Sequence, residues 1–287
     1  MVSIQSISHR RKRPSYYAGR FVIYILLLFG IVLYAFPLLW MVCTALKDNT
    51  EIMRMPPSIL PEAWDWNNFP DALSEFPFFL YLRNTLLIVC VQMIGNVTSA
   101  SLVGYSFARL RWPGRDVWFV VLIATMMLPG AVTMIPTFIM YKNFGWMNTY
   151  LPFTVPTFCG SAFNIFLLRQ FFRSIPMDLS ESAKLDGCPE LGIFLRIILP
   201  LCKPALATIA IFGFMGCWND YLGPLLYLND ETKFTLTYGL RTFQMQHGTD
   251  WPHLMAAATI ISIPTILIFF LCQRYFIEGI TLTGMKG

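Results

Sequence analysis

The sequence predicts an all-α integral membrane protein with six transmembrane helices, and three observations support this prediction. Of the 287 residues, 56% are hydrophobic and only 13% are charged, whereas about a quarter of the residues of a soluble domain are charged. The mean hydropathy is +0.56. Six apolar segments are long enough to cross a bilayer, which takes about 20 residues. They are 21–46, 82–107, 117–141, 150–170, 204–228 and 255–276.

The first apolar segment follows a basic run at residues 9–13, an arrangement that also occurs in secretory signal peptides. Its apolar run spans residues 21–46, whereas the apolar core of a signal peptide has about 7–15 residues. No small-residue cleavage site follows it. We therefore expect an uncleaved first helix behind a cytoplasmic tail, residues 1–20, with residues 21–287 forming a single transmembrane domain.

The Lys and Arg residues are distributed unevenly between the connecting segments. With the N-terminus inside, the cytoplasmic segments hold fifteen of the 21 Lys and Arg residues. Cytoplasmic loops are enriched in these residues, so the distribution predicts that both termini are cytoplasmic. The same enrichment explains the net charge of +5. Because no basic stripe with interleaved aromatics occurs outside the spans, nucleic acid is not an expected partner.

Two further features concern the shape of the spans and loops. Pro129 and Pro136 in the third segment predict kinks there. The outer loop 47–81 is rich in proline and tryptophan, and we expect it to be irregular with a short helix near 68–75.

A polar stretch, 173–203, lies between the fourth and fifth segments. Asp178 and Glu181 have the spacing of a capping box, which predicts a helix that begins at Leu179. Gly187 supplies the positive φ that a helix C-cap requires. Pro189 suits the first position of a second short helix, which is expected to end near Leu199 and Pro200.

Two interpretations of this stretch stay open on physical grounds. It forms either an elbow that turns the chain between spans, or a docking element for a soluble partner. In the second case we expect Ala183 and Gly187, four residues apart, to share one helix face that lets the partner approach the backbone closely. Glu181 and Asp186 would offer charges to the partner.

The motifs of this stretch resemble a known family. Glu181-Ser182-Ala183, followed by Gly187 and then by Leu199-Pro200, resembles the EAA loop of ABC transporter permeases, with Ser182 in place of an alanine. Other short motifs resemble carbohydrate-uptake permeases, including the smaller permease subunit of the maltose transporter. These are LP at 128–129, IP at 135–136, NTY at 148–150, FLLRQFF at 166–172, WNDY at 218–221 and QRYF at 273–276.

The resemblance implies a permease subunit of a bacterial sugar importer in the inner membrane. It implies a second permease as a heterodimer partner, two ATPase subunits that bind ATP and Mg, and an extracytoplasmic solute-binding protein that meets loops 47–81 and 229–254. The residues expected to couple to the ATPase are Asp178, Glu181, Ser182, Ala183, Asp186, Gly187, Leu199 and Pro200. The tail residues Gly284, Met285, Lys286 and Gly287 are expected to touch the ATPase as well.

The chain is not expected to be an enzyme or to bind a cofactor or metal itself. Gly279 and Gly284 have the spacing of a phosphate-binding loop, but Met285 stands where that motif requires lysine. The three histidines form no ligand cluster in the sequence. An ion-coupled secondary transporter remains an alternative, because Asp220 is an acid within a predicted span. An ABC permease for a polyol or sugar phosphate is another.

A substrate path is predicted along the fourth and fifth spans. Aromatic rings there suit the apolar faces of sugar rings, and amides or carboxylates suit the hydroxyl groups. Ordinary helix packing is the favoured explanation for any single one of these residues, and the resemblance implies that the sugar can be held mainly by the other permease. The residues of this path are Asn164, Phe214, Trp218, Asn219, Asp220 and Tyr221.

Overall fold

The computed structural model describes residues 14–245 and 248–284, so residues 1–13 of the predicted tail lie outside the described residues. The chain divides into two compact units, Met1–Ala72 with Thr249–Thr259 and Leu73–Gly248 with Ile260–Gly287. The long helix α15 (Trp251–Gly284) begins in the first unit and continues in the second.

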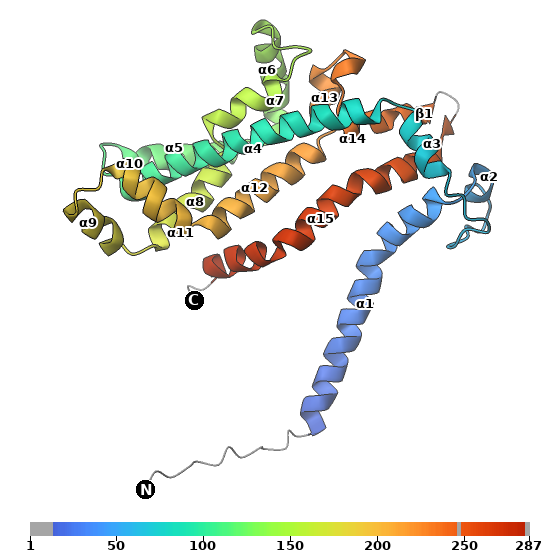
Figure 1. Ribbon diagram of the computed structural model, residues 1–287, viewed down its shortest axis with the longest axis horizontal. Helices are drawn as coiled ribbons and strands as arrows, with labels where there is room; N and C mark the ends of the chain where they lie inside the picture. Colours follow the sequence, from blue (N-terminus) through green and yellow to red (C-terminus); the bar gives the residue numbers. More distant parts are fainter. Residues whose placement is uncertain (1–13, 246–247, 285–287) are drawn as a thin grey trace. The chain divides into compact units, whose positions relative to one another are not determined.

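The first unit is dominated by α1 (Pro14–Ala45), drawn in blue in Figure 1. Large apolar side chains cover it on all sides, and those from Phe21 to Leu28 are each at least half exposed. A helix that is apolar all round suits a hydrocarbon environment, which agrees with the predicted first span.

A buried ion pair organises the loop after α1. Lys47 precedes α2 (Asn49–Ile52) and is 3% exposed, whereas Glu51 lies within α2 and is 6% exposed. Lys47 Nζ lies 3.9 Å from Glu51 Oε1. The Ser58 hydroxyl donates to Glu51 Oε1 at 2.6 Å. Asn68, the first residue of α3 (Asn68–Ser74), donates to the Lys47 carbonyl at 3.0 Å. The predicted short helix near 68–75 is therefore present, and the loop around it is fastened by polar contacts.

The second unit is built around α4 (Phe78–Arg109), against which α8 (Ala162–Ser174) and α12 (Lys203–Trp218) pack (Figure 1). Gly104 permits this packing, because a Cβ there would lie 3.2 Å from Leu168 Cβ and 3.3 Å from the Ile165 carbonyl. Small residues at helix contacts let the backbones approach closely, as is common in membrane bundles.

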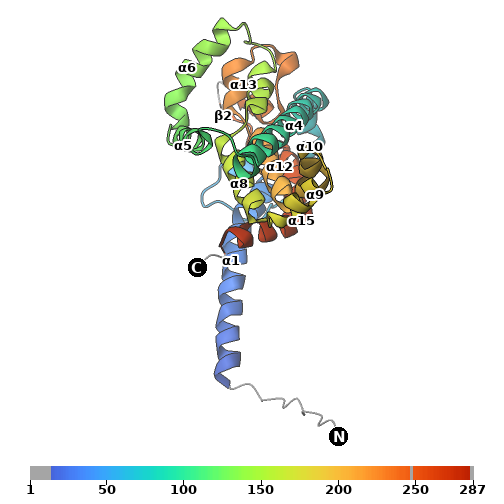
Figure 2. The same ribbon diagram turned by 90° about the vertical axis from the view of Figure 1, so that its left-hand side faces the viewer.

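The third predicted span, 117–141, is not one continuous helix. It consists of α5 (Arg115–Thr125) and α6 (Gly130–Asn143), which meet at 97° (Figure 2). Pro129 precedes α6 with an extended backbone, φ −63° and ψ 137°. A proline removes one backbone donor and disfavours helix in the residue before it, so the predicted kink is a full break. Pro136 lies inside α6.

The fifth predicted span, 204–228, is shorter than expected. The helix α12 ends at Trp218, and α13 (Leu222–Tyr227) follows as a separate element. Before α12 the chain runs through α10 (Glu190–Ile193), a π-helical turn η2 (Phe194–Ile198) and α11 (Leu199–Leu201), with a bend of 78°. The fourth predicted span, 150–170, begins before α8 with α7 (Leu151–Thr154) and a 3-10 turn, η1 (Val155–Cys159).

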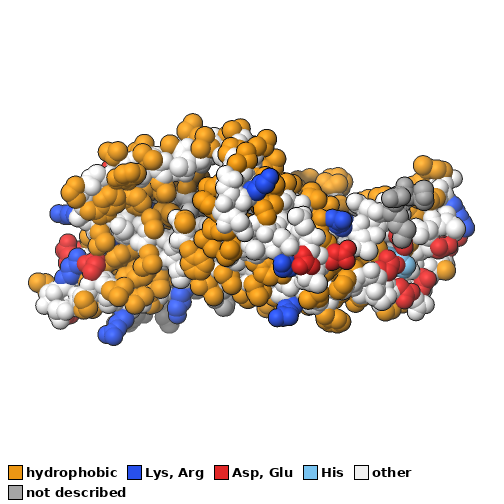
Figure 3. Space-filling view, turned by 90° about the horizontal axis from the view of Figure 1, so that it is seen from above, with side chains coloured by type: hydrophobic (Ala, Val, Ile, Leu, Met, Phe, Trp, Pro, Cys, Tyr) orange, Lys and Arg blue, Asp and Glu red, His pale blue; other side chains and the backbone are white. Residues whose placement is uncertain are grey.

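Among the described residues, four helical segments are long and apolar enough to cross a membrane, or up to six if each bent pair counts as one span. In the space-filling view of Figure 3, apolar side chains predominate over much of the visible surface. Exposed apolar surface of this extent is normal for a protein solvated by lipid.

The segment after α13 packs on the start of α4 through its first two helical elements. It contains η3 (Glu231–Lys233), α14 (Leu236–Gly239), η4 (Leu240–Phe243), β1 (Gln244–Met245) and β2 (Gly248–Thr249). Asn84 donates to the carbonyls of Thr232 at 2.9 Å and Phe234 at 3.0 Å. The Thr232 hydroxyl and N–H both donate to Asp230, which lowers the pKa of that carboxyl.

Candidate functional site

The polar stretch contains one exposed helix, α9 (Asp178–Leu185). Met177 is the residue that precedes it, and neither Asp178 nor Glu181 caps its start through a side-chain hydrogen bond, so the predicted capping box is wrong. Asp178 is already the first helical residue and stands one position too late to act as the N-cap. Both carboxylates still lie in the first turn, where negative charge is favourable for the helix dipole.

The end of α9 agrees with the sequence prediction at Gly187, whose φ is +77°. The Gly187 N–H donates to the Lys184 carbonyl at 3.0 Å, and the Cys188 N–H donates to the Ala183 carbonyl at 2.9 Å. This pair of bonds is the Schellman motif, which ends a helix at a residue in the left-handed conformation. The second helix starts at Glu190 rather than at the predicted Pro189, which is its N-cap.

The docking interpretation requires Ala183 and Gly187 to share one helix face, but in the structure they do not. Ala183 is buried in the core that contains Phe172 and Ile193, whereas Gly187 is exposed beyond the end of the helix. A helical repeat continues only while the helix does, and it ends before Gly187. The exposed side chains of α9 include Glu181, Ser182 and the apolar Leu185, which is 90% exposed.

Glu190 connects α9 to α4 through its two carboxylate oxygens, and the sequence analysis did not predict this connection. Its Oε1 accepts a 2.6 Å hydrogen bond from the Tyr105 hydroxyl of α4, and its Oε2 lies 2.9 Å from Lys184 Nζ in α9. Tyr105 is 85 residues away in the sequence. No local spacing pattern signals such a contact.

A second set of hydrogen bonds connects α4 to the segment that precedes α9. Arg109, the last residue of α4, is 7% exposed, and its guanidinium donates to the carbonyls of Phe172 and Ile175. A buried guanidinium is stable only with such partners. The candidate docking helix is therefore connected to α4 from both sides.

The other predicted coupling residues lie at the edges of this segment. Asp186 is exposed at the C-cap of α9, Leu199 is partly buried at the start of α11, and Pro200 is exposed. Gly284 is the last residue of α15. Met285, Lys286 and Gly287 lie outside the described residues.

Farther along the second unit, a groove of about 320 Å³ with both polar and apolar lining residues lies between α4, α6, the η1 segment and α13. This volume is within the range of about 300–1,000 Å³ that is typical of small-molecule pockets. Its lining residues are Gln92, Asn96, Thr137, Tyr141, Pro152, Phe153, Pro156, Thr157, Gly160, Ser161, Asp220, Gly223 and Tyr227.

Asp220 is the one member of the predicted substrate path that lines this groove. Phe214 and Trp218 are buried and stack on each other at 5.2 Å between ring centroids. The Trp218 indole donates to the Ile261 carbonyl at 2.9 Å. Trp218 thereby joins α12 to α15, and neither aromatic lines the groove.

The remaining predicted path residues also lie elsewhere. Asn164 is buried near the start of α8, and the Asn219 amide donates to the Met215 carbonyl at 2.8 Å, at the end of α12. Tyr221 is half-exposed with its ring 5.7 Å from that of Tyr238.

The groove contains polar residues that sequence reasoning missed. Gln92 and Asn96 are four residues apart in α4 and therefore lie on one face of that helix. Thr137 of α6 and Ser161 belong to the same groove lining. Amides at helical spacing within an apolar span were the available signal, because polar residues in spans usually face the protein interior.

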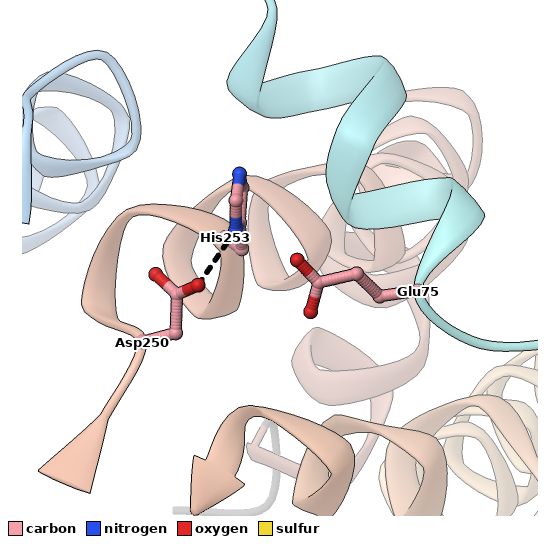
Figure 4. Close-up of side chains that lie close together, drawn as sticks. All are labelled: Glu75, Asp250 and His253. Atoms are coloured by element: carbon pink, nitrogen blue, oxygen red, sulfur yellow. Dashed lines mark hydrogen bonds and ion pairs between the residues drawn. The ribbon is translucent and has the colours of Figure 1, made fainter.

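In the first unit, Asp250 and His253 form a pair at the start of α15. His253 Nδ1 lies 2.7 Å from Asp250 Oδ2 (Figure 4). Asn49 donates to the other carboxylate oxygen of Asp250 at 3.2 Å. These contacts join α15 to the loop that carries α2. His247 lies outside the described residues.

Residues 100–281, which include α9 and most of the groove, match the family described as the binding-protein-dependent transport system inner membrane component. The chain belongs to this family. The predicted resemblance to carbohydrate-uptake ABC permeases is thereby confirmed. The permease is 32% identical to the arabinooligosaccharides transport system permease protein AraQ of Halalkalibacterium halodurans, over 88% of this chain and 91% of the relative.

Two further comparisons place the permease among transport proteins. It is 31% identical to the sn-glycerol-3-phosphate transport system permease protein UgpE of Yersinia enterocolitica, over 90% of this chain and 94% of the relative. A solved bacterial ABC transporter involved in the import of the acidic polysaccharide alginate has a chain with the same fold. The TM-score is 0.79 at 23% identity, and the match covers 93% of this chain and 99% of that one.

Proposed function

We propose that the permease is a subunit of a bacterial ATP-driven importer of oligosaccharides or related carbohydrates. The observation that carries the proposal is α9, a polar and exposed helix between apolar segments. It lies within the part of the chain that matches a transport family. A polar helix of this kind leaves the membrane to meet a soluble partner. The similarity to an arabinooligosaccharide permease supports the substrate class.

In this proposal the broken segments 117–141 and 204–228 each form one span, which gives six spans, and both termini lie in the cytoplasm of a bacterial inner membrane. The excess of Lys and Arg in the predicted cytoplasmic segments supports this orientation. The segment that contains α9 is then cytoplasmic, and the loops around α2 and η3 are extracytoplasmic.

The coupling partner is a cytoplasmic ATPase, present as two subunits that bind ATP and Mg. A second permease completes the translocation path, and an extracytoplasmic solute-binding protein delivers the substrate. The exposed residues Glu181, Ser182 and Asp186 offer polar contacts to the ATPase, and Leu185 offers an apolar anchor. Tyr105 and Arg109 transmit movement of α9 to α4, because their partners lie on either side of that helix.

Two other functions are weaker candidates. A permease for a sugar phosphate is supported by the similarity to UgpE. An ion-coupled carrier would use the groove carboxylate of Asp220, but the family match argues against independent transport.

The test is to isolate the permease from its native membrane and identify what comes with it by mass spectrometry. Leu185→Asp adds a charge at a 90% exposed position of α9 and should remove an ATPase while retaining a second permease. The matched control is Leu60→Asp, which makes the same change at a 64% exposed position in the first unit and should keep both the ATPase and the second permease.

The proposal would be wrong if the wild-type permease were isolated alone, or if it retained the ATPase equally in both variants. Isolation as a monomer or homo-oligomer would favour the ion-coupled carrier.

A further inference from the structure

We infer that the groove at Asp220 is a binding site for neutral, polyhydroxylated solutes and that it rejects anions. The inference deepens the proposed function, on which it rests for the class of cargo. It also assigns direct contact with that cargo to this subunit.

The charge of the groove favours a neutral ligand. Among the described residues that line it, Asp220 is the one charged side chain, and none is lysine or arginine. A phosphate or carboxylate ligand is bound most strongly by basic groups that pair with its negative charge. It would instead meet a carboxylate, and like charges placed together are strongly unfavourable.

The carboxylate of Asp220 is held in place by the start of α13. Its Oδ1 accepts a 2.9 Å hydrogen bond from the Gly223 N–H. A carboxylate has about four lone-pair sites, so acceptor capacity remains for ligand hydroxyl groups. Gly223 permits this position, because a Cβ there would lie 2.3 Å from Asp220 Oδ2 and 2.9 Å from a carbon of the Phe153 ring.

The rest of the lining complements a sugar. Gln92, Asn96, Thr137 and Ser161 offer neutral donors and acceptors for hydroxyl groups. Aromatic rings form one wall, with Tyr227 at 5.4 Å from Tyr141 and 5.9 Å from Phe153 between ring centroids. Aromatic faces beside a few polar groups are the usual composition of small-molecule sites.

The experiment measures direct binding to the full-length permease in lipid nanodiscs, with whatever partners are isolated with it, by saturation-transfer NMR. The probes are arabinotriose, which is neutral, and sn-glycerol-3-phosphate, each at about 10 mM so that a millimolar site is mostly filled. We expect a signal from arabinotriose and none from sn-glycerol-3-phosphate.

Asp220→Asn keeps the oxygen that accepts the Gly223 N–H and removes the charge, so it should weaken arabinotriose binding about tenfold. Gly223→Ala should have a similar effect by displacing the carboxylate. The matched control Asp230→Asn makes the same chemical change at a residue outside the groove lining and should leave binding unchanged.

Three results would overturn the inference: no binding of arabinotriose, equal or stronger binding of sn-glycerol-3-phosphate, or unchanged arabinotriose binding in both groove variants. Each would leave the importer proposal standing, since that proposal depends on the isolation of an ATPase and a second permease. Loss of those partners with selective arabinotriose binding retained would overturn the importer and keep the groove.

Discussion

The hydroxyl group of Tyr105 in α4 donates a 2.6 Å hydrogen bond to Glu190 Oε1, and the other oxygen of that carboxylate lies 2.9 Å from Lys184 Nζ in α9. One carboxylate thus connects the exposed helix to the central helix of the bundle. A displacement of α9 by a partner would pull on α4 through this connection.

Removal of the Tyr105 hydroxyl should weaken the connection without unfolding the protein. Tyr105→Phe keeps the buried ring, and Glu190 keeps its pairing with Lys184. We expect a loss of about 1 kcal/mol of stability and a larger relative loss of uptake than of ATPase association. Thermal unfolding in detergent, pull-down and uptake measurements check this, with Tyr34→Phe at an 85% exposed position as the control. Full uptake in Tyr105→Phe would show that the connection does not transmit movement.

Ala183 tests packing rather than docking. Ala183→Asp places a carboxylate in the core beside Phe172 and Ile193 and should lower stability by about 3 kcal/mol or more. Ser182→Asp makes a comparable change at the adjacent exposed position and should unfold at the wild-type temperature. Fluorescence-detected size-exclusion chromatography after heating measures both. Equal melting temperatures would contradict the burial of Ala183.

Gly187 tests the backbone at the end of α9. A Cβ at Gly187 would meet no atom within 4 Å, so the cost of Gly187→Ala comes from its φ of +77° alone. A residue with a Cβ loses about 1 kcal/mol there. Gly216→Ala is the matched control, because Gly216 is helical and its Cβ position is equally open, so it should be neutral or stabilising. A similar melting temperature for the two variants would speak against the Schellman end of α9.

The buried pair of Lys47 and Glu51 should govern the order of the loop after α1. Glu51→Gln leaves the Lys47 ammonium buried without its counter-ion, and we expect a loss of about 3 kcal/mol. Limited proteolysis should then cut within residues 48–67. The control is Glu62→Gln. Glu62 forms an ion pair with Arg54 in which both side chains are more than half exposed, so its loss should change neither stability nor cleavage. Protease resistance in Glu51→Gln would show that the pair is dispensable.

Local features of the chain were predictable because they depend on local chemistry. Long apolar runs give the helices that can span a membrane, and Gly187 stops α9 because glycine adopts positive φ without strain. Pro129 marked the position of a bend, although its backbone geometry makes that bend a break between α5 and α6. The family could also be predicted, because the spacing of the EAA loop is contained in one short stretch.

The sequence by itself therefore determined the apolar segments, the polar insert with its turn and the transport family. Only the tertiary structure decided which side chains meet. It buried Ala183, and it brought the Tyr105 hydroxyl to Glu190. It also placed Asp220, between α12 and α13, in the same groove as Gln92 of α4. Such contacts join residues far apart in the chain. They depend on how whole helices pack, and hydrophobic periodicity and motif spacing carry no information about that packing.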